Sequence, residues 1–253
     1  MKIMKSVDIC DVPISSVNIP QACEIINGWI RQRKKTYICV APVSTIVDCQ
    51  SDPEYKKILG NADMITPDGM PLVWMAKIMG DKNIARTYGP DLMLALCEKG
   101  KERGYKHYLY GGTKSTCSLL ENVLKKKFSD INISGHAPPF KPSHAQEDQE
   151  VIDEINGSNA DILWVGLGSP KQDYWMYEHR QKLNVPVMIG VGAAFDFIAG
   201  VKKQAPCWMQ KCGLEWFFRF CNEPRRLWKR YLIGNTRFIY LLMKHVLKSR
   251  PEK

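Results

Sequence analysis

Asp68 is the residue best placed to act as a base. It directly follows a strand expected at Met64–Thr66 and precedes a helix expected over 70–79, so the Pro-Asp-Gly turn that carries it is stiff. A carboxylate at such a sheet edge could accept a proton from an incoming hydroxyl, and we expect Thr66 and Gly69 beside it to contact the substrate. The alternative is that Asp68 is an N-cap, which accepts hydrogen bonds from the first N–H groups of the helix.

Two glycine-containing loops could bind an anion or a sugar. In Tyr110–Thr113, the N–H groups of Gly111 and Gly112 could approach an anion at the start of the next helix. This loop lacks the third glycine of a dinucleotide-binding fingerprint. In Gly166–Gln172, a proline suits the first helical turn, and Gln172 offers a donor and an acceptor to a nucleobase or sugar edge. An ordinary strand-to-helix turn is the alternative there.

Three further charged residues are candidates for substrate binding. Arg86 could clamp a phosphate or pair with a nearby carboxylate. Asp91 would most simply cap its helix, and we also count it among the substrate contacts. Asp196 lies in the apolar loop Gly190–Asp196, where burial without a partner costs free energy. It is therefore either held by a backbone or arginine donor, or functional.

The elements that must position these residues alternate along the chain. Apolar runs rich in β-branched and aromatic residues are interleaved with helical patterns from residue 36 to about 200, which is typical of βαβ crossovers. The expected fold is α/β: a Rossmann-like, mostly parallel sheet with helices on both faces, whose carboxyl edge collects the loops. Strands are expected at Tyr37–Val43, Met64–Thr66, His107–Tyr110, Ile131–Ser134, Ile162–Gly166 and Val187–Val191, and helices near 52–60, 70–79, 91–103, 114–128, 145–156 and 171–183.

The net positive charge of the chain lies in its last fifth. From Lys202 to Lys253 there are thirteen Lys or Arg against three Glu, a balance of +10 that equals the formal net charge of the whole protein. Aromatic and aliphatic residues are interspersed with these charges. A neutral body with such a tail suggests an enzyme that works against a polyanionic surface, either a membrane or nucleic acid.

The tail is expected to be an amphipathic helical appendage. At 100° per residue, one set of side chains gathers on one face and an apolar set lies opposite, although Gly234–Asn235 could divide the helix in two. We therefore expect a core over residues 1–200 and a membrane-associating appendage over 201–253. The basic set is Arg226, Arg230, Arg237, Lys244 and Lys248, and the apolar set is Leu227, Tyr231, Phe238, Ile239, Leu242 and Val246.

The cysteine content and the absence of several catalytic motifs indicate where the protein works and which reactions it does not use. Nine scattered cysteines without a CxxC pair indicate reduced thiols in a cytoplasm, and we favour buried thiols over metal ligation for Cys207, Cys212 and Cys221. The N-terminus lacks a secretory signal and no apolar run could span a bilayer. No DxD, Walker loop, HExxH or GxSxG motif occurs. We therefore expect neither a metal nor a cofactor, and a diphosphate leaving group would depend on Arg, Lys and helix N-termini.

Taken together, the blocks resemble the WecG/TagA/CpsF family of bacterial glycosyltransferases (glycosyltransferase family 26). The matching pieces run in the family's order over residues 37–232. They are Asp52–Pro53, Asn61–Gly69, Arg86–Asp91, Tyr110–Gly112, Gly166–Asp173, Gly190–Asp196, Ala205–Pro206, Gly213–Arg219, Glu223–Arg226 and Arg230–Tyr231.

The resemblance implies an inverting, metal-independent transfer of a sugar, typically N-acetylmannosamine, from its UDP form. The acceptor would be an undecaprenyl-diphosphate-linked N-acetylglucosamine on the inner, cytoplasmic face of the cell membrane, in cell-surface polysaccharide synthesis. It also implies that Asp68 is the base and that Arg219, Arg226 and Arg230 reach the donor diphosphate. The chain departs from the family pattern at Val40–Pro42 and Gly135–Phe140, near the expected sugar pocket, which leaves both sugars open.

Two other classes stay open at this stage. A nicotinamide-dependent Rossmann oxidoreductase would need the GxGxxG fingerprint and an acidic residue about 20 positions further on, and neither is evident. A nucleic-acid-binding protein would use the basic tail on phosphates but would leave the loop motifs unexplained. We expect no nucleic acid partner, and a homo-oligomer is left open.

Overall fold

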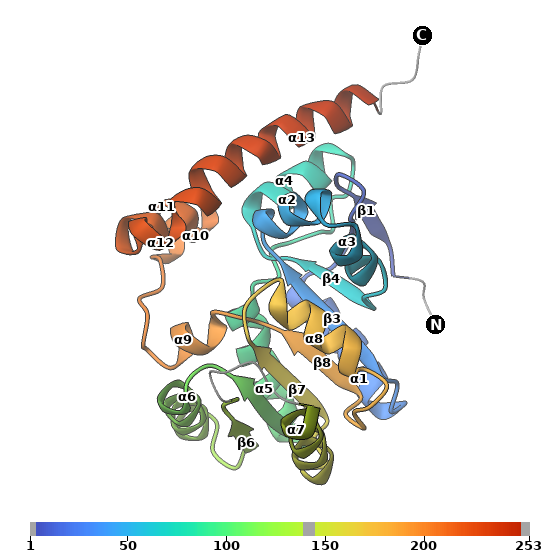
Figure 1. Ribbon diagram of the computed structural model, residues 1–253, viewed down its shortest axis with the longest axis vertical. Coiled ribbons are helices and arrows are strands. Elements are labelled where there is room, and N and C mark those ends of the chain that lie inside the picture. The colour runs from blue at the N-terminus through green and yellow to red at the C-terminus, as the bar shows by residue number, and fades with distance from the viewer. Residues whose placement is uncertain (1–3, 139–144, 249–253) are drawn as a thin grey trace. The chain divides into compact units, whose positions relative to one another are not determined.

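The computed structural model describes residues 4–138 and 145–248 (Figure 1). The chain divides into two compact units. The first unit comprises residues 1–18, 41–88 and 204–253, and the second comprises 19–40 and 89–203. The expected domain boundary near residue 200 stays a prediction.

A six-stranded sheet confirms the predicted α/β class. Its strand order is β4-β3-β8-β7-β5-β6, and the pairings among β3, β8, β7, β5 and β6 are all parallel. β3, β5, β7 and β8 are buried along most of their length because helices flank the sheet, which explains their mainly apolar sequences, whereas the edge strand β6 is partly exposed. All six predicted strands are present: β3 (Thr36–Ala41), β4 (Met64–Pro67), β5 (Lys106–Gly111), β6 (Asn132–His136), β7 (Ile162–Gly166) and β8 (Val187–Gly190).

In the second unit, helices follow the strands as the alternation predicts. Trp164 of β7 is fully buried, and its Nε1 donates to His107 Nδ1 on β5 at 3.1 Å. Burial lowers the pKa of His107 to about 4, so this imidazole is a neutral acceptor in the core. The helices are α1 (Ile19–Arg31), α5 (Gly89–Arg103), α6 (Lys114–Lys127), α7 (Ala145–Gly157), α8 (Lys171–His179) and α9 (Ala194–Ile198).

Several elements were missed by the sequence reasoning. β1 (Ser6–Asp8) and β2 (Pro13–Ser15) form an antiparallel pair, and at three residues each they are too short to show a period. The strand expected to reach Val43 ends at Ala41, and α2 (Val43–Ser51) starts almost at once. α1 was also missed, although its buried face follows helical spacing.

The first unit joins β4 and its neighbouring helices to the C-terminal segment. α13 packs against α2 (Figure 1), and Arg237 Nη2 of α13 donates to Ser51 Oγ at 3.2 Å. None of the helices in residues 4–138 and 145–248 is both long and apolar enough to cross a bilayer. The helices are α2, α3 (Pro53–Gly60), α4 (Met70–Ile78), α10 (Cys207–Lys211), α11 (Glu215–Asn222), α12 (Pro224–Trp228), a π-helix (Lys229–Ile233) and α13 (Gly234–Lys248).

The break suggested at Gly234–Asn235 is wrong. Gly234 has helical dihedrals (φ −63°, ψ −45°), and the helical backbone runs on from the π-helix into α13. A π-turn holds more residues than an α-turn, so it rotates the residues of α13 relative to a regular wheel. Of the apolar set expected opposite the basic residues, Ile239 is 57% exposed. Leu227, Tyr231 and Phe238 of the same set are buried within the protein, so the expectation that this whole face contacts a bilayer is wrong for them, while the side chains of Val246 and Lys248 lie outside the described ones.

Gly213 allows the C-terminal segment to approach α4 closely. Its φ is +70°, and a Cβ at this position would lie 2.6 Å from Cη2 of Trp74. Only glycine meets both demands without strain.

The interpretation of the three tail cysteines as buried thiols is wrong. Cys207, Cys212 and Cys221 are exposed, whereas the other six cysteines are buried. The apolar neighbours that suggested burial belong to short helices that leave these side chains at the surface.

Candidate active site

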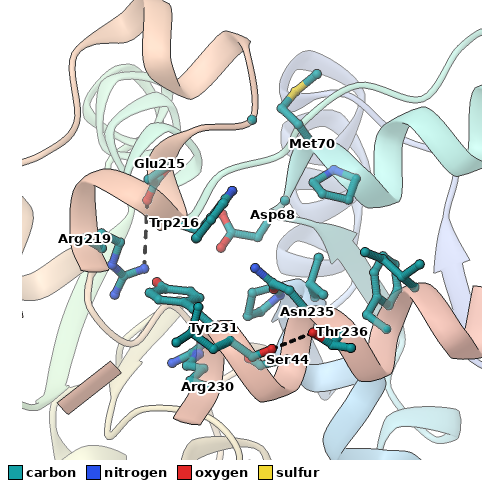
Figure 2. Close-up of a pocket in the computed structure, with 18 of the residues that line it drawn as sticks. Ser44, Asp68, Met70, Glu215, Trp216, Arg219, Arg230, Tyr231, Asn235 and Thr236 are labelled. Carbon is teal, nitrogen blue, oxygen red and sulfur yellow. Dashed lines mark hydrogen bonds and ion pairs between the residues drawn. The ribbon is translucent and has the colours of Figure 1, made fainter. Parts of the chain in front are cut away.

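A pocket of about 540 Å³ lies within the first unit (Figure 2). The start of α2, the β4–α4 turn and Arg86 form one part of its wall, and the C-terminal segment forms the rest. Five of the residues that the sequence singled out line it: Asp68, Gly69, Arg86, Arg219 and Arg230.

Asp68 faces this pocket and does not cap a helix. α4 has Gly69 as its N-cap and no side-chain cap hydrogen bond, so the N-cap alternative is wrong. The Asp68 N–H donates to the Ala41 carbonyl at 3.1 Å, which fixes the turn. Its side chain is 19% exposed. Within the described part of the chain, its buried Oδ1 accepts no hydrogen bond.

The surroundings of Asp68 make its carboxylate more basic. Burial raises its pKa to about 6, and the nearby Arg86 guanidinium opposes this rise. Arg86 Nη2 lies 3.9 Å from Asp68 Oδ1, which is an ion pair without a hydrogen bond. A carboxylate with a pKa near 6 is mostly ionised at neutral pH and is a better proton acceptor than an ordinary aspartate.

Arg86 is engaged on every side by protein groups. Its Nε donates to the Asp68 carbonyl at 2.5 Å, its Nη1 donates to Gln210 Oε1 at 3.0 Å, and its Nη2 pairs with Glu215 Oε2. Its guanidinium carbon also lies 3.9 Å from the ring centroid of Tyr88. Of the two hypotheses for Arg86, the structure therefore shows the carboxylate pairing.

Glu215 was missed as a functional candidate. It pairs with Arg86, accepts from the Tyr88 hydroxyl at 3.2 Å, and lies 3.9 Å from Arg219 Nη1 (Figure 2). One feature of the sequence could have pointed to Glu215, because it is one of only three acidic residues in the basic tail.

Arg230 is the cation in the pocket wall that lacks a protein acceptor. Within the described residues it makes no hydrogen bond or salt bridge, and it lies beside Arg219 and Tyr231 (Figure 2). Burial lowers its pKa, and the charge of Arg219 adds to this effect. A desolvated guanidinium without a hydrogen-bond acceptor costs free energy, which the charges of Asp48 and Asp68 offset only in part, and an anion in the pocket would supply the acceptor.

Two other predicted site residues of the first unit lie outside the pocket lining. Thr66 is fully buried in β4, and its hydroxyl has no hydrogen-bond partner among the residues described. Arg226 is exposed and pairs with Glu223, three residues earlier.

In the second unit, Gly111 and Gly112 have a structural role at the end of β5. Both have positive φ, and a Cβ on Gly111 would lie 2.6 Å from the backbone of Gly166. The Gly112 N–H donates to the Gly166 carbonyl at 3.2 Å, so this donor is already used. Thr113 caps α6 by accepting from the Thr116 N–H at 3.1 Å.

The remaining predicted residues of this unit also have protein partners. Gln172 is buried in the first turn of α8, and its Oε1 accepts from the Gly168 N–H at 3.1 Å, which ties the loop to the helix. Asp196 lies in α9, not in a loop, and pairs with Lys202 at 2.9 Å, so its partner is a lysine and not the backbone or arginine donor that was expected. Asp91 is the third residue of α5 and is exposed, so the expectation that it precedes this helix as its N-cap is wrong.

The pocket combines a basic carboxylate with guanidinium groups. Asp68 can take a proton, and Arg219 and Arg230 can offset the charge of phosphates. No cluster of three or more His, Cys, Asp or Glu side chains suited to a metal was found in residues 4–138 and 145–248. Fold and site together define an α/β protein whose pocket has the groups needed for proton transfer and for binding an anion.

Comparison with known sequences identifies the family to which the chain belongs. A model of the "Glycosyl transferase WecG/TagA/CpsF family" matches residues 7–252, so the chain belongs to this family. It is therefore a glycosyltransferase. The two alternatives left open by the sequence, a nicotinamide-dependent oxidoreductase and a nucleic-acid-binding protein, are excluded.

Three bacterial relatives named "N-acetylglucosaminyldiphosphoundecaprenol N-acetyl-beta-D-mannosaminyltransferase" are similar over most of both chains. The relative from Bacillus spizizenii is 28% identical, covering 86% of this chain and 82% of its own. That from Bacillus subtilis is 29% identical, covering 85% of each. That from Staphylococcus aureus (strain MW2) is 25% identical, covering 96% and 93%.

Proposed function

We propose that this glycosyltransferase moves N-acetylmannosamine or a related hexose from a UDP-sugar to an undecaprenyl-diphosphate-linked N-acetylglucosamine. The relatives are named for this acceptor and this sugar. The observation that carries the proposal is the pocket that holds the Asp68 carboxylate, its Oδ1 unpartnered within the described residues, together with Arg230.

In the proposed reaction, Asp68 removes the proton of an acceptor hydroxyl. The resulting oxygen attacks the anomeric carbon from the side opposite UDP, the glycosidic bond forms, and the bond to the UDP oxygen breaks with inversion. General-base assistance of this kind contributes about 10²–10⁴-fold. Arg219 and Arg230 supply positive charge for the diphosphate groups, so the scheme invokes no metal.

The protein would work as a peripheral protein at the cytoplasmic face of the cell membrane, in cell-surface polysaccharide synthesis. The C-terminal segment exposes apolar side chains, which we call the tail apolar surface, next to exposed basic residues such as Arg225 and Lys229. Apolar groups settle at the bilayer boundary, and each basic residue near anionic lipid contributes about 1 kcal/mol. The tail apolar surface consists of Trp228, Leu232, Ile233, Ile239, Tyr240, Met243 and Leu247.

A donor screen tests the proposed reaction. UDP-sugars are offered with a short-chain prenyl-diphosphate-linked N-acetylglucosamine, and the product is identified by mass spectrometry. We expect one additional N-acetylhexosamine or hexose per acceptor, formed by the wild type and strongly reduced in Asp68→Asn. Absence of product with every UDP-sugar, in the presence of anionic vesicles, would refute the proposal.

A further inference from the structure

We propose that the pocket next to Asp68 has a separate lipid subsite, which binds the first isoprene units of the acceptor. This inference rests on the proposed function, because it assigns part of the same pocket to one part of that substrate. The subsite, which we call the apolar arm, is formed by Val43, Met70, Pro71, Phe238, Ile239 and Leu242.

The pocket changes character from one end to the other. Glu215 and Arg219 lie on one side of Asp68, whereas Met70 lies on the other (Figure 2). The walls of the apolar arm come from the starts of α2 and α4 and from one face of α13. A pocket with cations at one end and aliphatic carbon at the other complements a prenyl diphosphate.

A nucleoside is a poor match to the apolar arm. Uracil and ribose present donors and acceptors that lose free energy when they are buried without partners. The polar side chains next to the arm are Ser44, Asn235 and Thr236, and the Thr236 hydroxyl already donates to the Leu232 carbonyl at 2.7 Å. An isoprene chain needs no hydrogen bond and gains from burial of its methyl and methylene groups.

The apolar arm opens toward apolar side chains that are in contact with solvent. Ile239 and Leu232 line the pocket and are 57% and 52% exposed. Both also belong to the tail apolar surface. A chain of many isoprene units that filled the arm could therefore leave it along the surface that we expect to contact the bilayer.

Ile239→Ser is the variant that isolates the apolar arm, with Ile78→Ser as its matched control. Ile78→Ser makes the same chemical change at a 76% exposed position at the end of α4, and Ile78 does not line the pocket. Because both side chains are exposed, we expect both variants to fold with wild-type melting temperatures. Binding of farnesyl diphosphate and of inorganic diphosphate is measured by calorimetry in the absence of membranes.

We expect the wild type to bind farnesyl diphosphate at least about tenfold more tightly than diphosphate. Ile239→Ser should lose most of this difference, and Ile78→Ser should keep it. Equal affinities of the wild type for the two ligands, or equal losses in the two variants, would refute the lipid subsite. Binding of laurate as tight as that of farnesyl diphosphate would also refute it, since the arm would then accept any amphiphile.

Transfer kinetics separate this inference from the proposed function. With acceptors of two and six isoprene units, kcat/KM should rise about tenfold or more with chain length in the wild type and much less in Ile239→Ser. Transfer that is independent of chain length would contradict the lipid subsite alone. Tight farnesyl diphosphate binding without transfer to any acceptor would contradict the proposed function alone.

Discussion

Arg86 and Glu215 form a partly buried ion pair although they are 129 residues apart in the chain. Their side chains are 15% and 14% exposed, and Gln210 shares the same guanidinium. The pair connects the segment that carries the proposed base to the helix that carries Arg219. The arginine that the sequence suggested as a phosphate clamp therefore positions the C-terminal segment beside Asp68.

Asp68→Asn should lower kcat about 10²–10⁴-fold while UDP still binds. The amide keeps the shape of the side chain but cannot take a proton at neutral pH. The measurement is initial rate together with calorimetric titration of UDP. Asp130→Asn, at an exposed turn with φ +65° that asparagine tolerates, is the control and should change neither quantity. Undiminished turnover in Asp68→Asn would remove this residue from the mechanism.

The stability of the protein should depend on pH through Asp68. Its pKa is about 6 in the folded chain against an ordinary value of 3.8, so the folded state binds the proton more tightly than the unfolded state. Protonation therefore stabilises the fold as the pH falls from about 7 to 4, by up to ~3 kcal/mol. Denaturant unfolding of the wild type and Asp68→Asn at several pH values measures this difference. Parallel pH profiles of the two proteins would show that burial does not raise this pKa.

Glu215→Gln should move the acid limb of the kcat/KM profile to lower pH. The negative charge of Glu215 raises the pKa of Asp68, so its removal lowers that pKa. The variant should also lose about 1–3 kcal/mol of unfolding free energy, because Arg86 loses a charged acceptor. The control is Glu223→Gln, which removes a carboxylate from the half-exposed pair with Arg226. It should change neither the acid limb of the kcat/KM profile nor the unfolding free energy. An unmoved acid limb in Glu215→Gln would contradict the coupling.

Arg230→Met should have opposite effects on stability and activity. The wild-type guanidinium has no hydrogen-bond acceptor among the described residues, so replacing it should leave the unfolding free energy unchanged or raise it by about 1 kcal/mol. Transfer should fall at least about 10²-fold, because the diphosphates lose a cation. Lys229→Met changes the neighbouring exposed residue and should retain far more activity. Loss of stability in Arg230→Met would indicate that Arg230 has a structural role.

The tail apolar surface should bind the protein to anionic vesicles. The variant Tyr240→Ser/Met243→Ser removes two side chains that are 63% and 55% exposed, and it should weaken flotation with phosphatidylglycerol vesicles about tenfold or more. Leu119→Ser, at a 46% exposed position on α6, is the control. Binding should fall as salt rises, because the basic residues contribute. A wild-type protein that stays unbound at low salt would refute membrane attachment.

Most of the sheet could be predicted from sequence because β3, β4, β7 and β8 are buried along nearly all of their length and are therefore mainly apolar, whereas the edge strand β6 is exposed in part. The pocket could be predicted only in part. Asp68 follows a strand in a rigid turn, which is a local signal, whereas the engagement of Arg86 by Glu215 depends on contacts far along the chain. The orientation of Arg230 depends on the π-helix at Lys229–Ile233, which a regular helical wheel does not represent.

The pocket at Asp68 is lined on one side by the carboxylate of this residue and on another by side chains from residues 230–242. While the protein is being synthesised, the nascent chain therefore lacks a complete cavity until residues 230–242 have left the ribosome. At about 5–20 residues per second, this segment follows the strands by seconds. Premature termination after the sheet would yield a chain that retains Asp68 but lacks the wall that residues 230–242 contribute to its pocket.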